Sequence, residues 1–314
     1  MLRAWQAFFE NEPGPGGAGI QDRFVAMWRH VARRFARATA VAGFDILNEP
    51  NALSDEQQRR LSALYARVLE ALRRGERDGR GRRHLVLFEP SVLWSATGHG
   101  APPAFRHDRD VVYAPHIYTG GFDDGPITRA AFAVTRREAK LFGGAPVLAG
   151  EWGTDPARAG PRGDGYFLAH QRLQDAFRIS ATLWTWRESC GDPHKIADVR
   201  VGRTPVPWGE WNVDCATNTV RGPRAALVAE LTRGYVRAAP GRLTAAAWDP
   251  AQTVLRASGR APHRAGRLVA FYPGVPRIRT AGLGHIRTTK LPGGGQLVTA
   301  TARGGAWRLR IGRR

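Results

Sequence analysis

The sequence is poor in lysine and in cysteine. Its lysines are Lys140, Lys195 and Lys290, and its cysteines are Cys190 and Cys215. Two cysteines are too few for a disulfide-rich scaffold. No apolar run reaches the roughly 18 residues that a membrane-crossing helix needs, so we expect no such helix. The first residues lack an apolar segment followed by a cleavage site, and no secretory signal is recognisable there.

The two cysteines are compatible with a disulfide or with two free thiols. Cys190 and Cys215 flank a polar segment, and a bond between them would close a loop of 25 residues (215 − 190). Neither cysteine belongs to a C-x-x-C pair, and a metal site would need further ligands. We therefore expect no metal at these cysteines and keep both redox states open.

Positive charge is in large excess and is carried almost entirely by arginine. The chain has 47 Lys and Arg against 27 Asp and Glu, a formal net charge of +20. Such an excess is typical of proteins that bind polyanions. The arginines are scattered over many predicted helix faces instead of gathering in one stripe, which favours a solvated surface and predicts no nucleic-acid partner. Attraction to acidic lipid head groups or acidic sugars is the alternative.

Strand and helix patterns alternate along the first two thirds of the chain. Short apolar runs bounded by turn residues predict strands at 42–50, 84–90, 111–118, 146–153 and 181–186. Apolar residues at helical spacing predict helices at 20–35, 127–142, 165–179 and 221–236, and a capping box of Ser54 and Gln57 starts another. The first 19 residues, rich in Gly and Pro, are expected to be irregular. The alternation predicts an α/β fold with a parallel sheet.

Beyond about Pro240 the pattern changes to short strands separated by Gly and Pro turns. The strand-like segments are 243–250, 253–259, 267–274, 296–302 and 306–311. Segments of this kind predict a small all-β sandwich. We therefore expect two domains, an α/β domain over residues 1–238 and a β-sandwich over residues 239–314.

Polar and aromatic side chains gather where the predicted strands end. They are Asn48, Glu49, Glu89, His116, Tyr118, Glu151, Trp184 and Trp186. Carboxyl ends of parallel strands meet at one edge, which is where ligands bind in such folds. Two carboxylates there, Glu49 and Glu151, suit a reaction in which one donates a proton and the other attacks, as in cleavage of a glycosidic bond. No metalloenzyme or nucleotide-binding motif occurs, so we expect neither metal nor cofactor.

These motifs resemble glycoside hydrolase family 5, the cellulase-like (β/α)8 barrels. Asn48-Glu49-Pro50, His116-Ile117-Tyr118, Gly150-Glu151-Trp152-Gly153 and Trp186 have the order and strand positions of that family. The segments LAGEWGTDP and LWTWRESCGDPH, with the trailing β region, look most like the endoglycoceramidase branch. The resemblance implies a retaining hydrolase that cleaves between an oligosaccharide and ceramide. A family 5 β-glucanase or β-mannanase acting on polysaccharide is the alternative.

The resemblance assigns a role to each matching residue. Glu49 matches the general acid/base, and Glu151 matches the nucleophile. The remaining matches are substrate-binding or supporting residues: Asn48 for the sugar 2-hydroxyl, Tyr118 to orient Glu151, His116 to support the acid/base, and Trp186 as the floor under the sugar. From the residues alone, Glu89 is assigned a structural or rim role, with a third site carboxylate as the alternative, and Trp184 a core position. An ordinary strand-end histidine is the alternative for His116.

The chain departs from the family at its start. About 41 residues precede the strand that ends in Asn48-Glu49-Pro50, where family barrels have three strands. We therefore expect a (β/α)8 barrel lacking roughly its first three strands, with poor solubility or association through the uncovered strand. This could reflect a start recorded too far downstream or an inactive remnant. The family also implies an extracellular location, a carbohydrate or glycolipid substrate and possible contact with a lipid surface.

Overall fold

The computed structural model describes residues 2–121, 127–154, 164–188, 190, 208–263 and 266–314. These residues form two compact units. The first comprises Met1–Gly153 and Ile179–Trp184, and the second comprises Thr154–Arg178 and Thr185–Arg314. The division into domains 1–238 and 239–314 stays a prediction.

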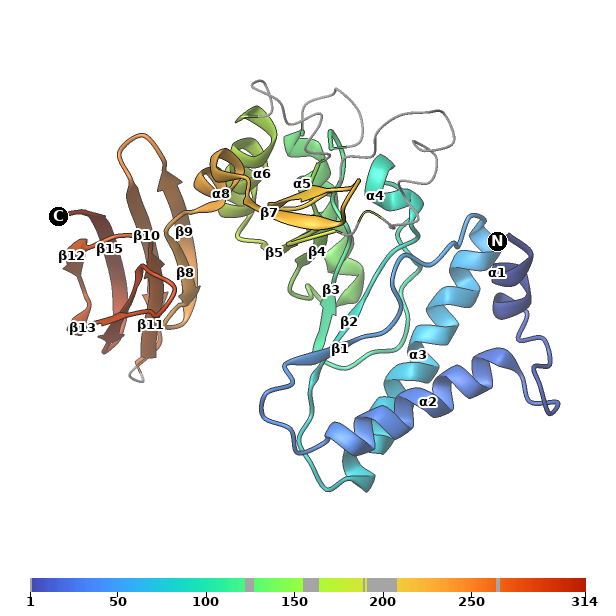
Figure 1. Cartoon of the computed structure of the whole chain (residues 1–314). Helices are drawn as coiled ribbons and strands as arrows, with labels where there is room; N and C mark the ends of the chain where they lie inside the picture. Colours follow the sequence, from blue (N-terminus) through green and yellow to red (C-terminus); the bar gives the residue numbers. More distant parts are fainter. Residues whose placement is uncertain (1, 122–126, 155–163, 189, 191–207, 264–265) are drawn as a thin grey trace. The chain divides into compact units, whose positions relative to one another are not determined.

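The first unit is built on parallel strands (Figure 1). These are β1 Gly43–Asp45, β2 Leu85–Phe88, β3 Val111–Tyr113, β4 Leu148–Trp152 and β5 Ser180–Leu183. β1, β2 and β3 pair in that order, β4 pairs with β5, and a parallel bridge between Tyr113 and Val147 joins the two groups. All five predicted strands are therefore present in chain order, each shorter than the sequence pattern suggested.

Helices cover these strands, and α3 supplies much of the core. The helices of this unit are α1 Leu2–Phe9, α2 Ile20–Phe35, α3 Asp55–Asp78, α4 Leu93–Thr97 and α5 Arg129–Glu138, followed by the 3₁₀ turn η1 Ala139–Phe142. The side chains of Leu61, Leu64 and Leu72 on α3 are fully buried. Burial of each contributes roughly 1.5–3 kcal/mol relative to exposure. Among the described helices, none is both long enough and apolar enough to cross a membrane.

Two segments differ from the prediction. Residues 2–9, expected to be irregular, form α1, where Trp5 stacks on Phe9 at 5.8 Å between ring centroids. The two rings lie one helical turn apart, and their packing stabilises this helix despite the Gly/Pro-rich segment that follows it. The helix predicted at 221–236 is wrong for most of its length. It divides into the end of strand β7 Thr219–Pro223, helix α8 Ala225–Leu231 and strand β8 Tyr235–Ala238, because Pro223 and Gly234 interrupt the helical pattern.

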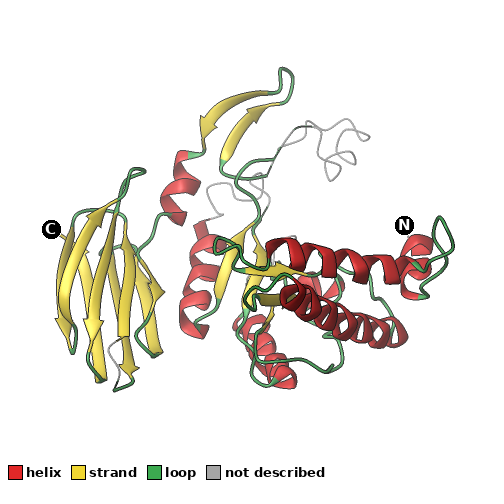
Figure 2. Cartoon of the chain, turned by 90° about the horizontal axis from the view of Figure 1, so that it is seen from below, coloured by secondary structure: helices red, strands yellow, loops and turns green. Residues whose placement is uncertain are grey.

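The second unit contains helix α6 Asp164–Phe177, a hairpin of β6 Trp211–Asp214 and β7, helix α8, and two antiparallel sheets drawn as yellow arrows in Figure 2. One sheet has the order β12-β15-β10-β9 and the other β13-β14-β11-β8. Their remaining strands are β9 Arg242–Asp249, β10 Val254–Ala261, β11 Gly266–Tyr272, β12 Pro276–Ala281, β13 Gly284–Lys290, β14 Gln296–Ala302 and β15 Gly305–Arg313. The five predicted strands are present, and β8, β12 and β13 are additional.

One apolar core is shared by the two sheets. Leu255 and Leu309 from the first sheet join Leu268 and Val298 from the second in a single buried cluster. Alternate residues along each strand enter this cluster, as the period of two in a strand requires. The expected all-β sandwich is thus present at the C-terminal end.

Cys190 and Cys215 form a disulfide within the second unit, with their Cα atoms 5.3 Å apart. Of the two redox states that the sequence left open, the structure contains the bonded one. The bond links the chain just before the segment 191–207 to the turn after β6.

The capping box at the start of α3 is testable by mutation. Ser54 Oγ accepts the N–H of Gln57 at 3.2 Å, and the Gln57 side chain accepts the N–H of Ser54 at 3.2 Å. We expect Ser54→Ala to lower the free energy of unfolding by about 1 kcal/mol, because a backbone donor loses its partner. Denaturant unfolding measures the change. Ser54→Asp, which keeps an acceptor, should be close to the wild type; equal losses in both variants would contradict the assignment.

Candidate active site

Four strand ends bring polar side chains to one place in the first unit. Glu49 follows β1, Glu89 follows β2, His116 follows β3, and Glu151 lies within β4. Hydrogen bonds continue the sheet pairing past the ends of the short strands: the Ile117 N–H donates to the Glu151 carbonyl at 2.8 Å. This pairing sets the register that brings His116 next to Glu151.

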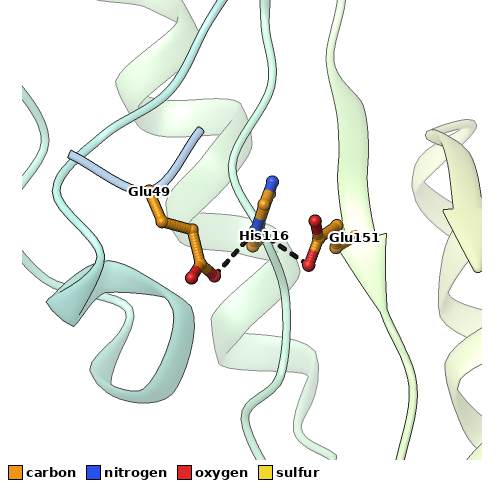
Figure 3. Close-up of side chains that lie close together, drawn as sticks. All are labelled: Glu49, His116 and Glu151. Atoms are coloured by element: carbon orange, nitrogen blue, oxygen red, sulfur yellow. Dashed lines mark hydrogen bonds and ion pairs between the residues drawn. The ribbon is translucent and has the colours of Figure 1, made fainter. Parts of the chain in front are cut away.

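His116 lies between the two predicted reactive glutamates (Figure 3). Its Nδ1 lies 2.9 Å from Glu49 Oε1 and 3.3 Å from Glu151 Oε2. Its Nε2 lies 3.2 Å from Glu89 Oε1. A neutral imidazole has one N–H donor, whereas the cation has two. Because both ring nitrogens face carboxylates, the arrangement favours the charged form.

The pKa of His116 reflects this surrounding. Burial lowers the pKa, but the hydrogen bonds to Glu49 and Glu89 and the negative charges of Glu89 and Glu151 outweigh it and raise the pKa to about 10. His116 is 4% exposed, so these charges act with little screening by water. The histidine is therefore a buried cation at neutral pH.

Glu151 is held by two donors. The Tyr118 hydroxyl donates to Glu151 Oε2 at 2.9 Å, and His116 Nδ1 approaches the same oxygen. Burial raises the pKa of Glu151, against the opposing effects of the His116 charge and the Tyr118 hydrogen bond. The role expected for Tyr118, to orient Glu151, matches this geometry. Among the described residues, no hydrogen bond or ion pair engages the other oxygen, Oε1.

Glu89 has a larger part in the site than the sequence indicated. It is 2% exposed, and its Oε2 accepts the backbone N–H of Glu49 at 2.9 Å while its Oε1 faces His116. Glu49 has a φ of 44°, a left-handed conformation that costs a non-glycine residue free energy. The Glu89 carboxylate therefore positions both the backbone of Glu49 and the ring of His116. A rim position for Glu89 is excluded by its burial, and the structural interpretation fits.

Gly150 makes room for the histidine. A Cβ at this position would lie 3.0 Å from His116 Cδ2 and 3.1 Å from the Ala114 carbonyl oxygen. Glycine is thus needed before Glu151 because the imidazole packs against the backbone there. The Gly150-Glu151 pair is visible in the sequence. The need for glycine there arises from the pairing of β3 with β4, which the sequence does not show.

Asp45 is a residue near the site that sequence reasoning missed. It lies on β1, four residues before Glu49. Its side chain keeps access to solvent, but neighbouring protein atoms displace enough water to raise its pKa to about 6, and the charges of Glu89 and Glu151 add to this effect against that of His116. An Asp within an apolar strand run is the signal that could have identified it.

The remaining predicted residues lie as follows. Asn48 is exposed beside Glu49. Trp186 belongs to the second unit, is 65% exposed and packs edge-on against Trp211 at 5.8 Å; its role under a sugar stays a prediction. Trp184 is 40% exposed, so the expected core position is wrong. The reason is that β5 ends at Leu183, which places Trp184 beyond the strand.

Comparisons with known proteins define the family. The model of Cellulase (glycosyl hydrolase family 5) matches residues 5–189, and the chain belongs to this family. A crystal structure of endogalactoceramidase superposes with a TM-score of 0.81 and 33% identity, covering 99% of this chain and 65% of that one. Endo-glycoceramidase II from Rhodococcus sp., in a complex with a cellobiose-like isofagomine, gives a TM-score of 0.74 at 20% identity, a similarity of fold.

A curated relative is a β-xylosidase from Phanerodontia chrysosporium. It is 28% identical over 190 residues, which is 54% of this chain and 38% of the relative. The chain thus spans 38% of this relative and 65% of the endogalactoceramidase structure. The family fold, with mixed helices and strands followed by all-β sheets, agrees with the predicted TIM-barrel-like class.

The contact between Gly150 and His116 predicts a cost for a larger residue. We expect Gly150→Ala to lower the free energy of unfolding by about 1–3 kcal/mol, because the added methyl group overpacks the ring and the Ala114 carbonyl. Denaturant unfolding measures this loss. Gly284→Ala is the control, since a Cβ there meets nothing within 4 Å. Similar behaviour of the two variants would show that the His116 contact is not tight.

The raised pKa of His116 predicts a specific pH dependence of stability. Its ordinary value is 6.5 and its folded value about 10. The stabilisation is therefore complete below pH 6.5 and is lost as the pH rises through about 10. We expect the difference in unfolding free energy between wild type and His116→Gln to shrink across this window. His99→Gln, at an exposed histidine, is the control; a constant difference for His116→Gln would refute the cationic state.

Proposed function

We propose that the chain carries the catalytic carboxylates of a retaining glycoside hydrolase of the endoglycoceramidase type. The observation that supports the proposal is the distance between Glu49 and Glu151. One oxygen of each, together with a His116 nitrogen, lies within 4.8 Å of the others. Retaining enzymes hold their carboxyl groups about 5–5.5 Å apart, whereas inverting enzymes leave about 6.5–9.5 Å for a water.

In the first proposed step, Glu151 attacks the anomeric carbon and Glu49 protonates the departing glycosidic oxygen. The carbon–oxygen bond to the leaving group breaks as the bond to Glu151 forms, and the proton of Glu49 leaves with the alcohol. Tyr118 and His116 hold Oε2 of Glu151, which directs Oε1 to the sugar. The fixed cation of His116 balances the negative charge, which lies on Glu151 before the first step and on Glu49 after it.

In the second step, Glu49 is ionised and removes a proton from water, which attacks the anomeric carbon and releases Glu151. Two inversions at one carbon give overall retention. Asn48 would contact the sugar 2-hydroxyl. No step requires a cofactor.

The proposed substrate is a glycosphingolipid cleaved between its oligosaccharide and ceramide. Support comes from the endogalactoceramidase structure, at 33% identity. The fold is also that of endo-glycoceramidase II, whose structure has been solved in a complex with ganglioside GM3. The matched β-xylosidase supports a second candidate, a glycosidase that acts on glycans other than glycolipids. The Cys190–Cys215 disulfide supports an extracellular location, because such bonds persist in oxidising compartments.

Substitution of the two glutamates tests the proposal. We expect Glu49→Gln to lower the rate by about 10²–10⁴-fold because a positioned proton donor is lost, and Glu151→Gln by at least as much. The chain, alone and with an N-terminal extension, is assayed on a glycosphingolipid in neutral detergent micelles by following oligosaccharide release. Proton NMR of the first product gives its anomeric configuration. Glu10→Gln, at an exposed glutamate, is the control.

Each alternative gives a different result. Product of inverted configuration would reject the double displacement. Hydrolysis of xylan, β-glucan or β-mannan without attack on glycolipid would show that the substrate is a polysaccharide and not a glycosphingolipid. No turnover of any substrate by either form of the chain would identify an inactive remnant.

A further inference from the structure

Arginines gather on one face of the C-terminal sandwich. The outward surface of the sheet β12-β15-β10-β9, here called the arginine face, carries Arg256, Arg277, Arg279, Arg308 and Arg310. All five residues are exposed. The interpretation that the arginines are merely scattered over helices therefore fails for this part of the chain. The sequence concealed the cluster because these residues come from three strands that are separated in the chain.

The pairing of the strands places like charges directly opposite one another. Arg279 on β12 faces Arg310 on β15, and Arg310 in turn faces Arg256 on β10. Three guanidinium side chains thus form one row across neighbouring strands, about 4.7–4.9 Å apart at the backbone. Like charges opposite each other in a sheet lower its stability, so this row is a local cost that an anionic ligand would relieve.

Acidic partners on this face are scarce. Arg256 has an ion pair with Asp249, at 3.7 Å. Within the described part of the chain, the structure gives no ion pair for Arg277, Arg279, Arg308 or Arg310. Their guanidinium groups remain available to bind phosphate or carboxylate oxygens in the planar, two-pronged geometry that arginine favours.

Small side chains separate the arginines. A depression of about 450 Å³ is lined by Ala245, Ala247, Ser258 and Ala281 as well as by arginines. The outer surface of the opposite sheet is mixed. Arg267 lies there beside Val269 and Phe271 on β11, and Arg287 on β13 pairs with Thr299. The arginine face is distinguished by arginines that pair directly with one another across strands. The low floor lets an extended charged surface approach the four arginines that line it, Arg256, Arg279, Arg308 and Arg310.

We propose that the arginine face docks the protein on an anionic phospholipid surface. Its charges extend in two dimensions, across three strands and along two of them, β12 and β15, as do the phosphates of a bilayer. A linear polyanion would be matched by a single line of charge. The choice of a lipid surface over an acidic polysaccharide rests on the proposed glycolipid substrate, which resides in membranes.

Binding to vesicles tests the proposal without using activity. The full chain is sedimented with vesicles of phosphatidylcholine and phosphatidylserine, and with vesicles of phosphatidylcholine alone. We expect binding to the anionic vesicles that weakens with added salt. The variant Arg256→Gln/Arg279→Gln/Arg308→Gln/Arg310→Gln should bind on the order of 600-fold more weakly, because each of the four arginines near such a surface contributes about a fivefold factor.

A variant of equal net charge is the matched control. Arg33→Gln/Arg37→Gln/Arg59→Gln/Arg77→Gln removes four exposed arginines of the first unit and should bind nearly as the wild type does. Equal weakening in both variants would show an effect of total charge and overturn the proposal. Retention on heparin that is lost in the arginine-face variant, with no vesicle binding by the wild type, would overturn it in favour of an acidic polysaccharide.

Hydrolysis in neutral micelles separates this proposal from the proposed function. Both quadruple variants should cleave glycolipid in such micelles at the wild-type rate, since no active-site residue changes. Absence of cleavage by every form would refute the glycolipid function. The vesicle measurement would still show whether the arginine face binds an anionic lipid surface. Near-ultraviolet circular dichroism confirms that the variants are folded.

Discussion

The candidate active site depends on one buried cation. His116 receives carboxylates at both ring nitrogens, from Glu49 and Glu151 on one side and Glu89 on the other. Without the imidazolium, three acidic side chains from three strands would repel one another in a region with little water. The histidine therefore explains how the carboxylates can approach as closely as the proposed double displacement requires.

The sheet supplies the geometry that this cation needs. Parallel pairing places the ends of β1, β2, β3 and β4 at one edge, and the hydrogen bond from Ile117 to the Glu151 carbonyl fixes the relative position of the last two. Gly150 removes the side chain that would displace the ring. Packing, backbone pairing and charge thus all fix the position of the His116 ring relative to Glu151.

Much of this organisation could be predicted from the sequence. The βαβ alternation located all five parallel strands, and polar residues after apolar runs identified Glu49, His116, Tyr118 and Glu151. The contact between Glu89 and the Glu49 N–H could not be predicted, because it depends on which strands are neighbours. β13 was missed because all of its residues are exposed, which leaves no apolar alternation to detect. Trp184 was misplaced because a strand end was set too late.

The left-handed backbone at Glu49 costs folding stability at the candidate active site. Such a conformation is comfortable for glycine and unfavourable for glutamate. Glycine at this position would relieve the unfavourable backbone conformation but would remove the carboxylate. The strained glutamate, held by the Glu89 carboxylate, therefore combines a lower folding stability with a fixed carboxylate position, as is typical of functional sites.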